Sequence, residues 1–193
     1  MKIYLIVGSL VAASSFSVIA YGKTLDLRNQ TDGDGGSREI SFCARPSPDK
    51  PGLPGHAFIA FSETSKDGTR AFRAIGHTVF SAGEALLSYT GLVNADGALV
   101  DEKYTSIKQQ CLTLQVNISD YQKSYGLVAQ PLKAIGVVLD ESKPIQKTYS
   151  LAAEDCVGFL IAQLQLFSPK LKAPSRTNGE LPLNYVRRLI DAN

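Results

Sequence analysis

The stretch from His56 to Phe80 constrains the fold most, because its pattern predicts a β-hairpin. Two runs rich in strand-forming residues flank the dipeptide Asp67-Gly68, which is typical of a turn between antiparallel strands. Elsewhere, the spacing of apolar residues predicts two further strands and three helices, at 38–44, 104–117, 119–135, 156–167 and 182–190. This pattern predicts an α+β domain in which helices pack against a small antiparallel sheet.

Four segments between these elements are predicted to be irregular. Residues 23–37 are polar and glycine-rich, so we expect a flexible lead-in to a domain that spans 38–193. Residues 45–55 carry four prolines, which cannot donate to a strand ladder and therefore predict a loop. Residues 81–103 have no clean period and 140–149 are polar, so both are expected to be connectors.

The N-terminus predicts export. Lys2 is followed by an uncharged apolar stretch, and small residues allow cleavage after Ala20 or Gly22, so residues 1–22 fit a secretory signal peptide. A retained membrane anchor is the alternative, because the stretch is almost long enough to span a bilayer. Its Gly, Ser and Ala content makes it weakly hydrophobic, which favours the signal peptide. The mature protein is then periplasmic or secreted, and no later stretch predicts stable membrane insertion.

Export bears on the cysteines. The chain has 3 of them, and in an oxidising compartment two can pair while one is left over. Cys43 and Cys111 lie in strand-like contexts, whereas Cys156 begins an apolar helix, so we expect a Cys43–Cys111 disulfide and a free Cys156. Three reduced, packed cysteines are the alternative.

The charge balance argues against one class of partner. The chain has 20 basic and 18 acidic side chains, a formal net charge of +2, and no basic run interleaved with aromatic residues. Nucleic-acid binding, which depends on neutralising phosphates, is therefore not expected.

His56 and His77 are the two histidines of the chain, and the hairpin register decides whether they meet. If the residue numbers of two paired positions add up to 133 or 135, both imidazoles lie on one face within side-chain reach. A three-residue loop gives an even sum and puts them on opposite faces. Two of these three registers bring the imidazoles together, and one ring could then act as a base while the other fixes its tautomer.

Cys156 is the candidate nucleophile. The first turn of a helix lowers a thiol pKa and offers backbone amides to an oxyanion, and Asp155 is placed to cap that helix. Gly158 is expected to leave the surface beside the sulfur open to substrate. Glu154 and Asp155 oppose a thiolate, because nearby carboxylates disfavour a second negative charge. A protonated His56 would have to outweigh them.

Four short motifs follow one another in an order that matches a known superfamily. They are Gly55-His56-Ala57-Phe58-Ile59, a second histidine at the end of the partner strand, Tyr149-Ser150-Leu151, and Asp155-Cys156-Val157-Gly158-Phe159. This arrangement resembles the circularly permuted NlpC/P60 superfamily of papain-like thiol hydrolases, which includes lecithin:retinol acyltransferase-like proteins and bacterial envelope families. The histidine precedes the cysteine, as in the permuted members, and the resemblance covers residues 38 to 190.

The resemblance implies a function and a site. Cys156 would be the nucleophile, His56 the base and His77 the third polar residue, with Gly158 and Tyr149 beside the substrate and no cofactor or metal. The protein would be an exported cysteine amidase or endopeptidase that acts on peptidoglycan stem peptides.

Three alternatives stay open. The same site could serve a lipid-directed thioesterase or acyltransferase, or the fold could persist as a catalytically inactive envelope binding module. His56, His77 and Cys156 could also bind zinc, although the sequence offers no fourth ligand and no short ligand spacing. The oligomeric state is left open.

Overall fold

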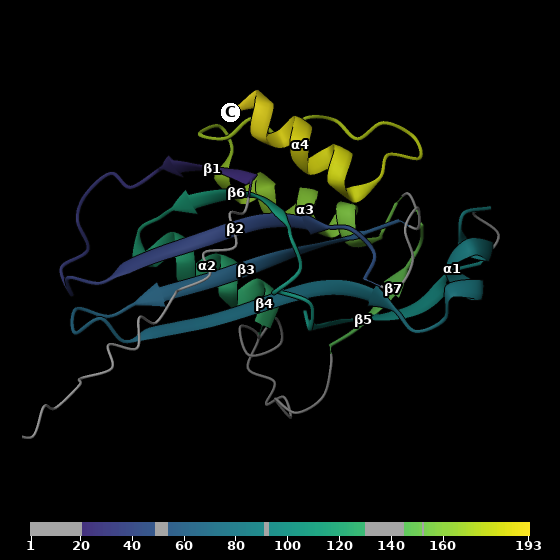
Figure 1. Ribbon diagram of the computed structural model, residues 1–193, viewed down its shortest axis with the longest axis horizontal. Helices are drawn as coiled ribbons and strands as arrows, with labels where there is room; N and C mark the ends of the chain where they lie inside the picture. The colour runs from purple at the N-terminus through teal and green to yellow at the C-terminus, as the bar shows by residue number, and fades with distance from the viewer. Residues whose placement is uncertain (1–20, 49–53, 91–92, 130–144, 152) are drawn as a thin grey trace, which may run out of the picture.

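The computed structural model describes residues 21–48, 54–90, 93–129, 145–151 and 153–193. In this part of the chain, seven strands form one sheet in the order β1-β6-β2-β3-β4-β5-β7 (Figure 1). The strands are β1 (Tyr21–Asp26), β2 (Ser37–Arg45), β3 (His56–Thr64), β4 (Arg70–Val79), β5 (Ala95–Asp101), β6 (Gln110–Gln115) and β7 (Ile145–Tyr149). The helices are α1 (Ala82–Ser88), α2 (Ile118–Ala129), α3 (Cys156–Leu164) and α4 (Pro182–Ala192), with a short 3-10 helix, Gln165–Phe167, after α3.

The predicted α+β class is confirmed, and so is the hairpin formed by β3 and β4. All neighbouring strands are antiparallel except β1 and β6, which are parallel. Five predictions fall partly outside the described residues. Residues 1–20 of the signal peptide, 49–53 of the proline-rich loop, 91–92 of the connector 81–103, 130–135 of the helix 119–135 and 140–144 of the connector 140–149 are not described.

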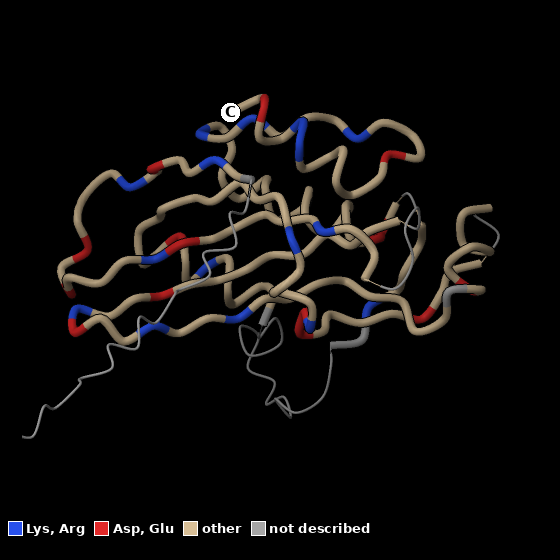
Figure 2. Tube along the Cα trace, viewed as in Figure 1, with Lys and Arg blue, Asp and Glu red and all other residues tan. Residues whose placement is uncertain are grey.

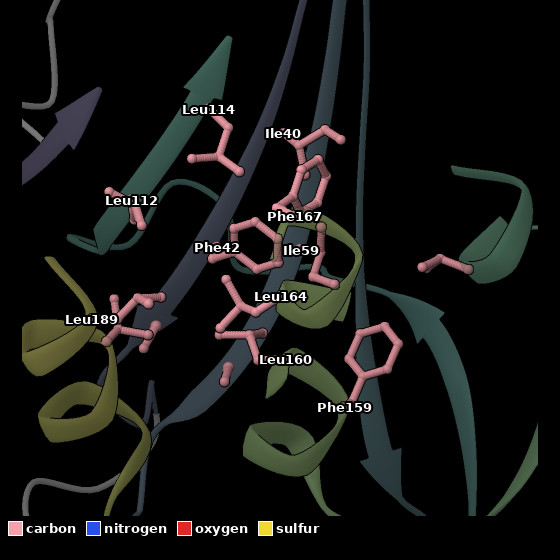
Figure 3. Packing of buried hydrophobic residues seen from close by; sticks show 14 of the residues in the cluster. Ile40, Phe42, Ile59, Leu112, Leu114, Phe159, Leu160, Leu164, Phe167 and Leu189 are labelled. Carbon is pink, nitrogen blue, oxygen red and sulfur yellow. The ribbon is translucent and has the colours of Figure 1, made fainter. Parts of the chain in front are cut away.

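One face of the sheet carries the main core. Because side chains alternate along a strand, every second residue of β2, β3 and β6 points toward α3 and α4. Figure 3 shows the strand and helix side chains that meet there, among them Ile40, Phe42, Ile59, Leu112, Leu114, Leu160, Leu164 and Leu189. Burying one such side chain contributes about 1.5–3 kcal/mol, so this layer fixes α3, and with it Cys156, against β3.

The segment 23–37 is not the flexible lead-in that the sequence predicts. β1 pairs with β6, from Tyr21 opposite Gln110 to Asp26 opposite Gln115, and Leu25 packs on the core. The folded domain therefore includes β1 and does not begin at residue 38. A six-residue strand whose only neighbour lies almost 90 positions away leaves little local signal, and this explains the wrong prediction.

A buried carboxylate ties the same segment to α2. Asp32 accepts hydrogen bonds from the backbone amide of Ile118 (3.1 Å), from Nδ2 of Asn117 (3.3 Å) and from Nη1 of Arg38 (3.1 Å). Burial raises the pKa of Asp32, but these hydrogen bonds outweigh it and leave the pKa below its ordinary value. The start of α2 is thus stabilised by a distant carboxylate at Ile118, one residue before the predicted Ser119.

Two predicted connectors contain regular structure. Residues 81–103 hold α1 and β5, and residues 140–149 hold β7. β5 contains two Asp and one Gly, which are poor strand formers, and its pairing with β4 on one side and β7 on the other overrides that preference. α1 lies beside β5 at the end of the sheet (Figure 1).

The opposite face of the sheet carries the predicted disulfide. Cys43 of β2 and Cys111 of β6 are directly paired across the two strands and are bonded, while Cys156 is free, so the predicted pairing is confirmed. The bond packs among buried Phe58, Ala60 and Ala74. A structural disulfide of this kind is consistent with an extracellular or otherwise oxidising compartment.

Charge and hydropathy add two observations. Basic and acidic residues are interspersed along the described chain (Figure 2), and over the whole sequence they nearly balance, with a net charge of +2. Among the described helices, none combines the length and the apolar character needed to cross a membrane.

Candidate functional site at the start of α3

The hairpin register separates the two histidines. Thr64 pairs with Arg70 and Phe58 with Gly76, so paired positions sum to 134. Ser65 donates its amide to the carbonyl of Thr69, which leaves a three-residue loop that ends at Gly68 with φ +86°. The expectation that His56 and His77 share one face is therefore wrong, because an even sum puts them on opposite faces.

His77 lies on the face that α3 covers. It pairs with Leu99 of the main core and is fully buried. Its ring contacts the rings of Tyr149 (centroids 5.1 Å apart) and Phe159 (6.5 Å). Nε2 lies 3.4 Å from the carbonyl oxygen of Lys147, and the ring is also hydrogen-bonded to the backbone of Asp155. Burial lowers the pKa of His77 below its ordinary value, so the ring is neutral at pH 7.

His56 lies on the opposite face. Its ring covers Gly76, where a Cβ atom would lie only 2.3 Å from Nε2. Nε2 is 3.4 Å from Oγ1 of Thr78 and 3.7 Å from Oε2 of Glu102. Burial lowers the pKa of His56 to about 4, and Glu102 offsets this only in part, with Arg45 adding to the lowering. His56 is therefore neutral at rest and turned away from the α3 face.

The neighbours of His56 give it a structural role. Glu102 accepts a hydrogen bond from Arg45 (3.0 Å) and one from the backbone amide of Tyr104 (2.8 Å). The Arg45 guanidinium also stacks 4.7 Å above the ring of Tyr104, and the amide of Glu102 bonds to the carbonyl of Ala74. This cluster anchors the segment that leaves β5 and crosses toward β6.

Cys156 is the first residue of α3, as predicted. Oδ1 of Asp155 caps the helix by accepting the backbone amides of Val157 and Gly158, each at 3.0 Å. The thiol is 6% exposed and lies against the backbone of Ala57. Burial raises the pKa of Cys156 to about 12, with Asp155 adding to the rise, although hydrogen bonding to the backbone of Ala57 opposes it. The expected lowering of the thiol pKa is outweighed by burial.

Arg176 completes the start of α3, and sequence reasoning missed it. Its guanidinium forms two parallel bonds to the carboxylate of Asp155, at 2.7 and 2.8 Å. This positive charge lowers the pKa of Cys156 and so opposes the effect of Asp155. Arg176 belongs to an irregular loop 21 positions from its partner, and nothing local in the sequence marks such a pair.

The two predicted substrate-binding residues, Gly158 and Tyr149, do not lie as expected. Gly158 is packed against a backbone carbonyl, and Tyr149 is buried. At Gly158, a Cβ atom would lie 2.1 Å from the carbonyl oxygen of Ala153. Glycine is required there by close backbone approach, which corrects the expected role of opening a path to the sulfur. Tyr149 is 7% exposed, and burial raises its pKa, with smaller contributions from Cys156 and Asp155. It stands beside the thiol as a neutral phenol.

The structure thus brings Cys156, His77 and Tyr149 into one buried neighbourhood and leaves His56 outside it. Extending the register by one step from Phe58 and Gly76 puts Ala57, which touches the thiol, beside His77. The zinc alternative finds no support, since the described residues contain no group of three or more His, Cys, Asp or Glu that could hold a metal ion.

A scan against models of known families and searches of curated proteins and of solved structures returned no match to this chain.

Proposed function

We propose that this protein is an extracytoplasmic thiol hydrolase in which Cys156 is the nucleophile and His77, rather than His56, is the base. The observation that carries the proposal is the neighbourhood at the start of α3. The free thiol lies against Ala57, and on the adjacent strand the buried imidazole of His77 lies on the same face of the sheet, next to the backbone of Asp155. A free thiol and an imidazole on the same face of the sheet are the minimal pair for acyl transfer.

The protonation states define the mechanism. Because burial keeps both Cys156 and His77 neutral at pH 7, no thiolate–imidazolium pair exists at rest. As Sγ attacks a substrate carbonyl carbon, its proton moves to the imidazole of His77, and the backbone amides of Cys156 and Ala57 stabilise the oxyanion. His77 then returns the proton to the leaving amine. A water molecule, deprotonated by the same imidazole, cleaves the thioester and restores the thiol.

Peptide amides of the bacterial cell wall are the substrate we propose first. The Cys43–Cys111 disulfide supports work outside the cytoplasm, and the motif order resembles that of the permuted NlpC/P60 hydrolases. A lipid ester would use the same Cys156 and His77 steps, so a thioesterase or acyltransferase is the next reaction to assay.

The assay uses purified mature protein and isolated peptidoglycan, with released peptides quantified by mass spectrometry. We expect wild type to release stem peptides, Cys156→Ser to release none, and His77→Gln to be roughly 10²–10⁴-fold slower, the usual contribution of a general base. His56→Gln is the matched control and should keep most of the activity. Full activity of His77→Gln together with loss of activity in His56→Gln would overturn the assignment of the base.

A binding module without activity is the second candidate function, and one observation favours it. Cys156 is only 6% exposed and its thiol pKa is raised to about 12, which is typical of a packed structural cysteine. In that case Cys156→Ser would leave binding to peptidoglycan unchanged, and no product would appear on either peptide or lipid substrates.

The site of signal cleavage follows from β1. Cleavage after Ala20 leaves β1 whole, whereas cleavage after Gly22 removes two residues that pair with Gln110 and Cys111. We therefore expect the exported protein to begin at Tyr21, which the intact mass of the periplasmic protein measures directly. A mass that corresponds to a start at Lys23, or to the uncleaved chain, would contradict this.

A further inference from the structure

A cavity of about 620 Å³ lies between α2 and the β3–β4 hairpin, apart from the Cys156 neighbourhood. Its floor includes Phe61, four positions along β3 from Ala57 and on the same face, which corresponds to about 13 Å of strand. The volume falls within the range of small-molecule sites. None of the residues around Cys156 lines it.

An aromatic wall forms one side of the cavity. Tyr121 and Tyr125 lie one turn apart on α2 with parallel rings, 3° between their planes and 6.1 Å between their centroids. Phe61 meets both rings edge-on, at 5.8 and 5.2 Å. Phe72 also borders the cavity, but it pairs with Ser62, so its ring lies on the opposite face of the sheet from Phe61 and Arg73. Because each tyrosine is held by two other rings, the wall keeps its shape without a ligand.

Paired charges form the other side. Nε of Arg73 donates to Asp101 (2.8 Å) and Nη1 of Arg73 to the hydroxyl of Tyr125 (3.4 Å). Arg38 pairs with Glu63 at 2.7 Å. Two guanidinium groups and two carboxylates cancel, so the cavity has no net charge. The side chains of Arg73, Asp101 and Glu63 are 40%, 66% and 38% exposed, which leaves donors and acceptors open to a ligand.

This combination selects a ligand chemistry. An anion would meet two carboxylates and a cation two guanidinium groups, while a purely apolar molecule would strip water from four charges without replacing it. A pyranose ring has an apolar C–H face that can lie on an aromatic ring, and its edge carries hydroxyl groups that both donate and accept hydrogen bonds. An arginine–aspartate pair offers a donor and an acceptor side by side to adjacent hydroxyls.

We propose that this cavity is a binding site for a neutral saccharide, which stacks on Tyr125 and hydrogen-bonds to the Arg73–Asp101 pair. The proposal does not depend on the chemistry of Cys156, because none of the residues that carry it belongs to that neighbourhood.

The test is a calorimetric titration of the mature protein with chitotriose, cellotriose and maltotriose, paired with saturation-transfer NMR. We expect at least one of the three to bind, and we expect Arg73→Gln and Tyr125→Leu to weaken that binding at least about tenfold, the loss expected for one removed contact group. Arg70→Gln is the matched control, since Arg70 lies on the same strand but donates to Ser62 and does not line the cavity. It should bind like wild type.

Thermal melts of all three variants establish that each is folded before the titration is interpreted. Two results would overturn the proposal: no binding of any of the three saccharides by the folded wild type, or binding that Arg73→Gln and Tyr125→Leu both leave unchanged. If a saccharide binds but Arg70→Gln weakens it as much as Arg73→Gln does, the site is on another surface and the proposal is equally wrong.

Discussion

Replacing Asp155 by alanine is expected to lower the free energy of unfolding by about 4 kcal/mol, because it removes one partner of a buried ion pair. Asp155 is 2% exposed and accepts two bonds from Arg176, whose guanidinium is 14% exposed and would be left without its counter-charge. The same substitution removes the cap from Val157 and Gly158, which alone costs about 1 kcal/mol.

Urea denaturation of the wild type and three variants measures this effect. Glu154→Ala is the matched control, since Glu154 is exposed one position away and should change the stability by no more than about 0.5 kcal/mol. Asp155→Asn keeps an acceptor for the cap and should lose less than Asp155→Ala. Equal stabilities of Asp155→Ala and Glu154→Ala would show that the ion pair contributes nothing to the fold.

The double substitution Cys43→Ala and Cys111→Ala is expected to lower the free energy of unfolding by about 4 kcal/mol. The bond joins residues 68 positions apart, and a closed loop of that length restricts the unfolded chain by about that amount. The substitution also leaves a gap among Phe58, Ala60 and Ala74, in a cluster separate from the main core.

Chemical denaturation of the double variant against oxidised wild type gives the measurement. Wild type treated with a reductant serves as the control, because it loses the bond but keeps both side chains. We expect the reduced protein to be less stable than oxidised wild type but more stable than the double alanine variant. A loss below about 1 kcal/mol in both would mean that the two strands are held together fully by their ladder and the core.

Sequence patterns predict the elements that depend on local order. The α3 start, its Asp155 cap and the Cys43–Cys111 pairing all follow from residues close together in the chain or from the parity of the cysteines. β1 and Arg176 were missed for one shared reason. Each depends on a partner brought near by the fold, β6 in one case and Asp155 in the other.

The histidines illustrate how a single residue of loop length changes a site. The Asp67-Gly68 signal predicts a turn, and a turn of two or four residues would have joined His56 and His77 on one face. The loop has three residues, so His56 joins Arg45 and Glu102 on one face while His77 joins Cys156 on the other. The raised pKa of the Cys156 thiol also could not be predicted from the sequence, because burial raises it by more than the start of the helix lowers it.

The most direct test of the proposed function is the pH–rate profile for acylation of Cys156 by p-nitrophenyl acetate in a single turnover. Cys156 is the free thiol, so intact mass identifies the acyl-enzyme. Burial lowers the pKa of His77 from 6.5 and raises that of Cys156 to about 12. Between these two values the imidazole is an unprotonated base and the thiol keeps its proton, so a base-assisted rate does not change with pH.

We therefore expect wild type and His56→Gln to share a flat profile from about pH 7 to pH 10. His77→Gln should be slower at pH 7 and rise about tenfold per pH unit, because only the small thiolate fraction then reacts. A wild-type rate that itself rises tenfold per unit and is unchanged in His77→Gln would contradict the account, and would leave Cys156 as a packed cysteine in a binding domain.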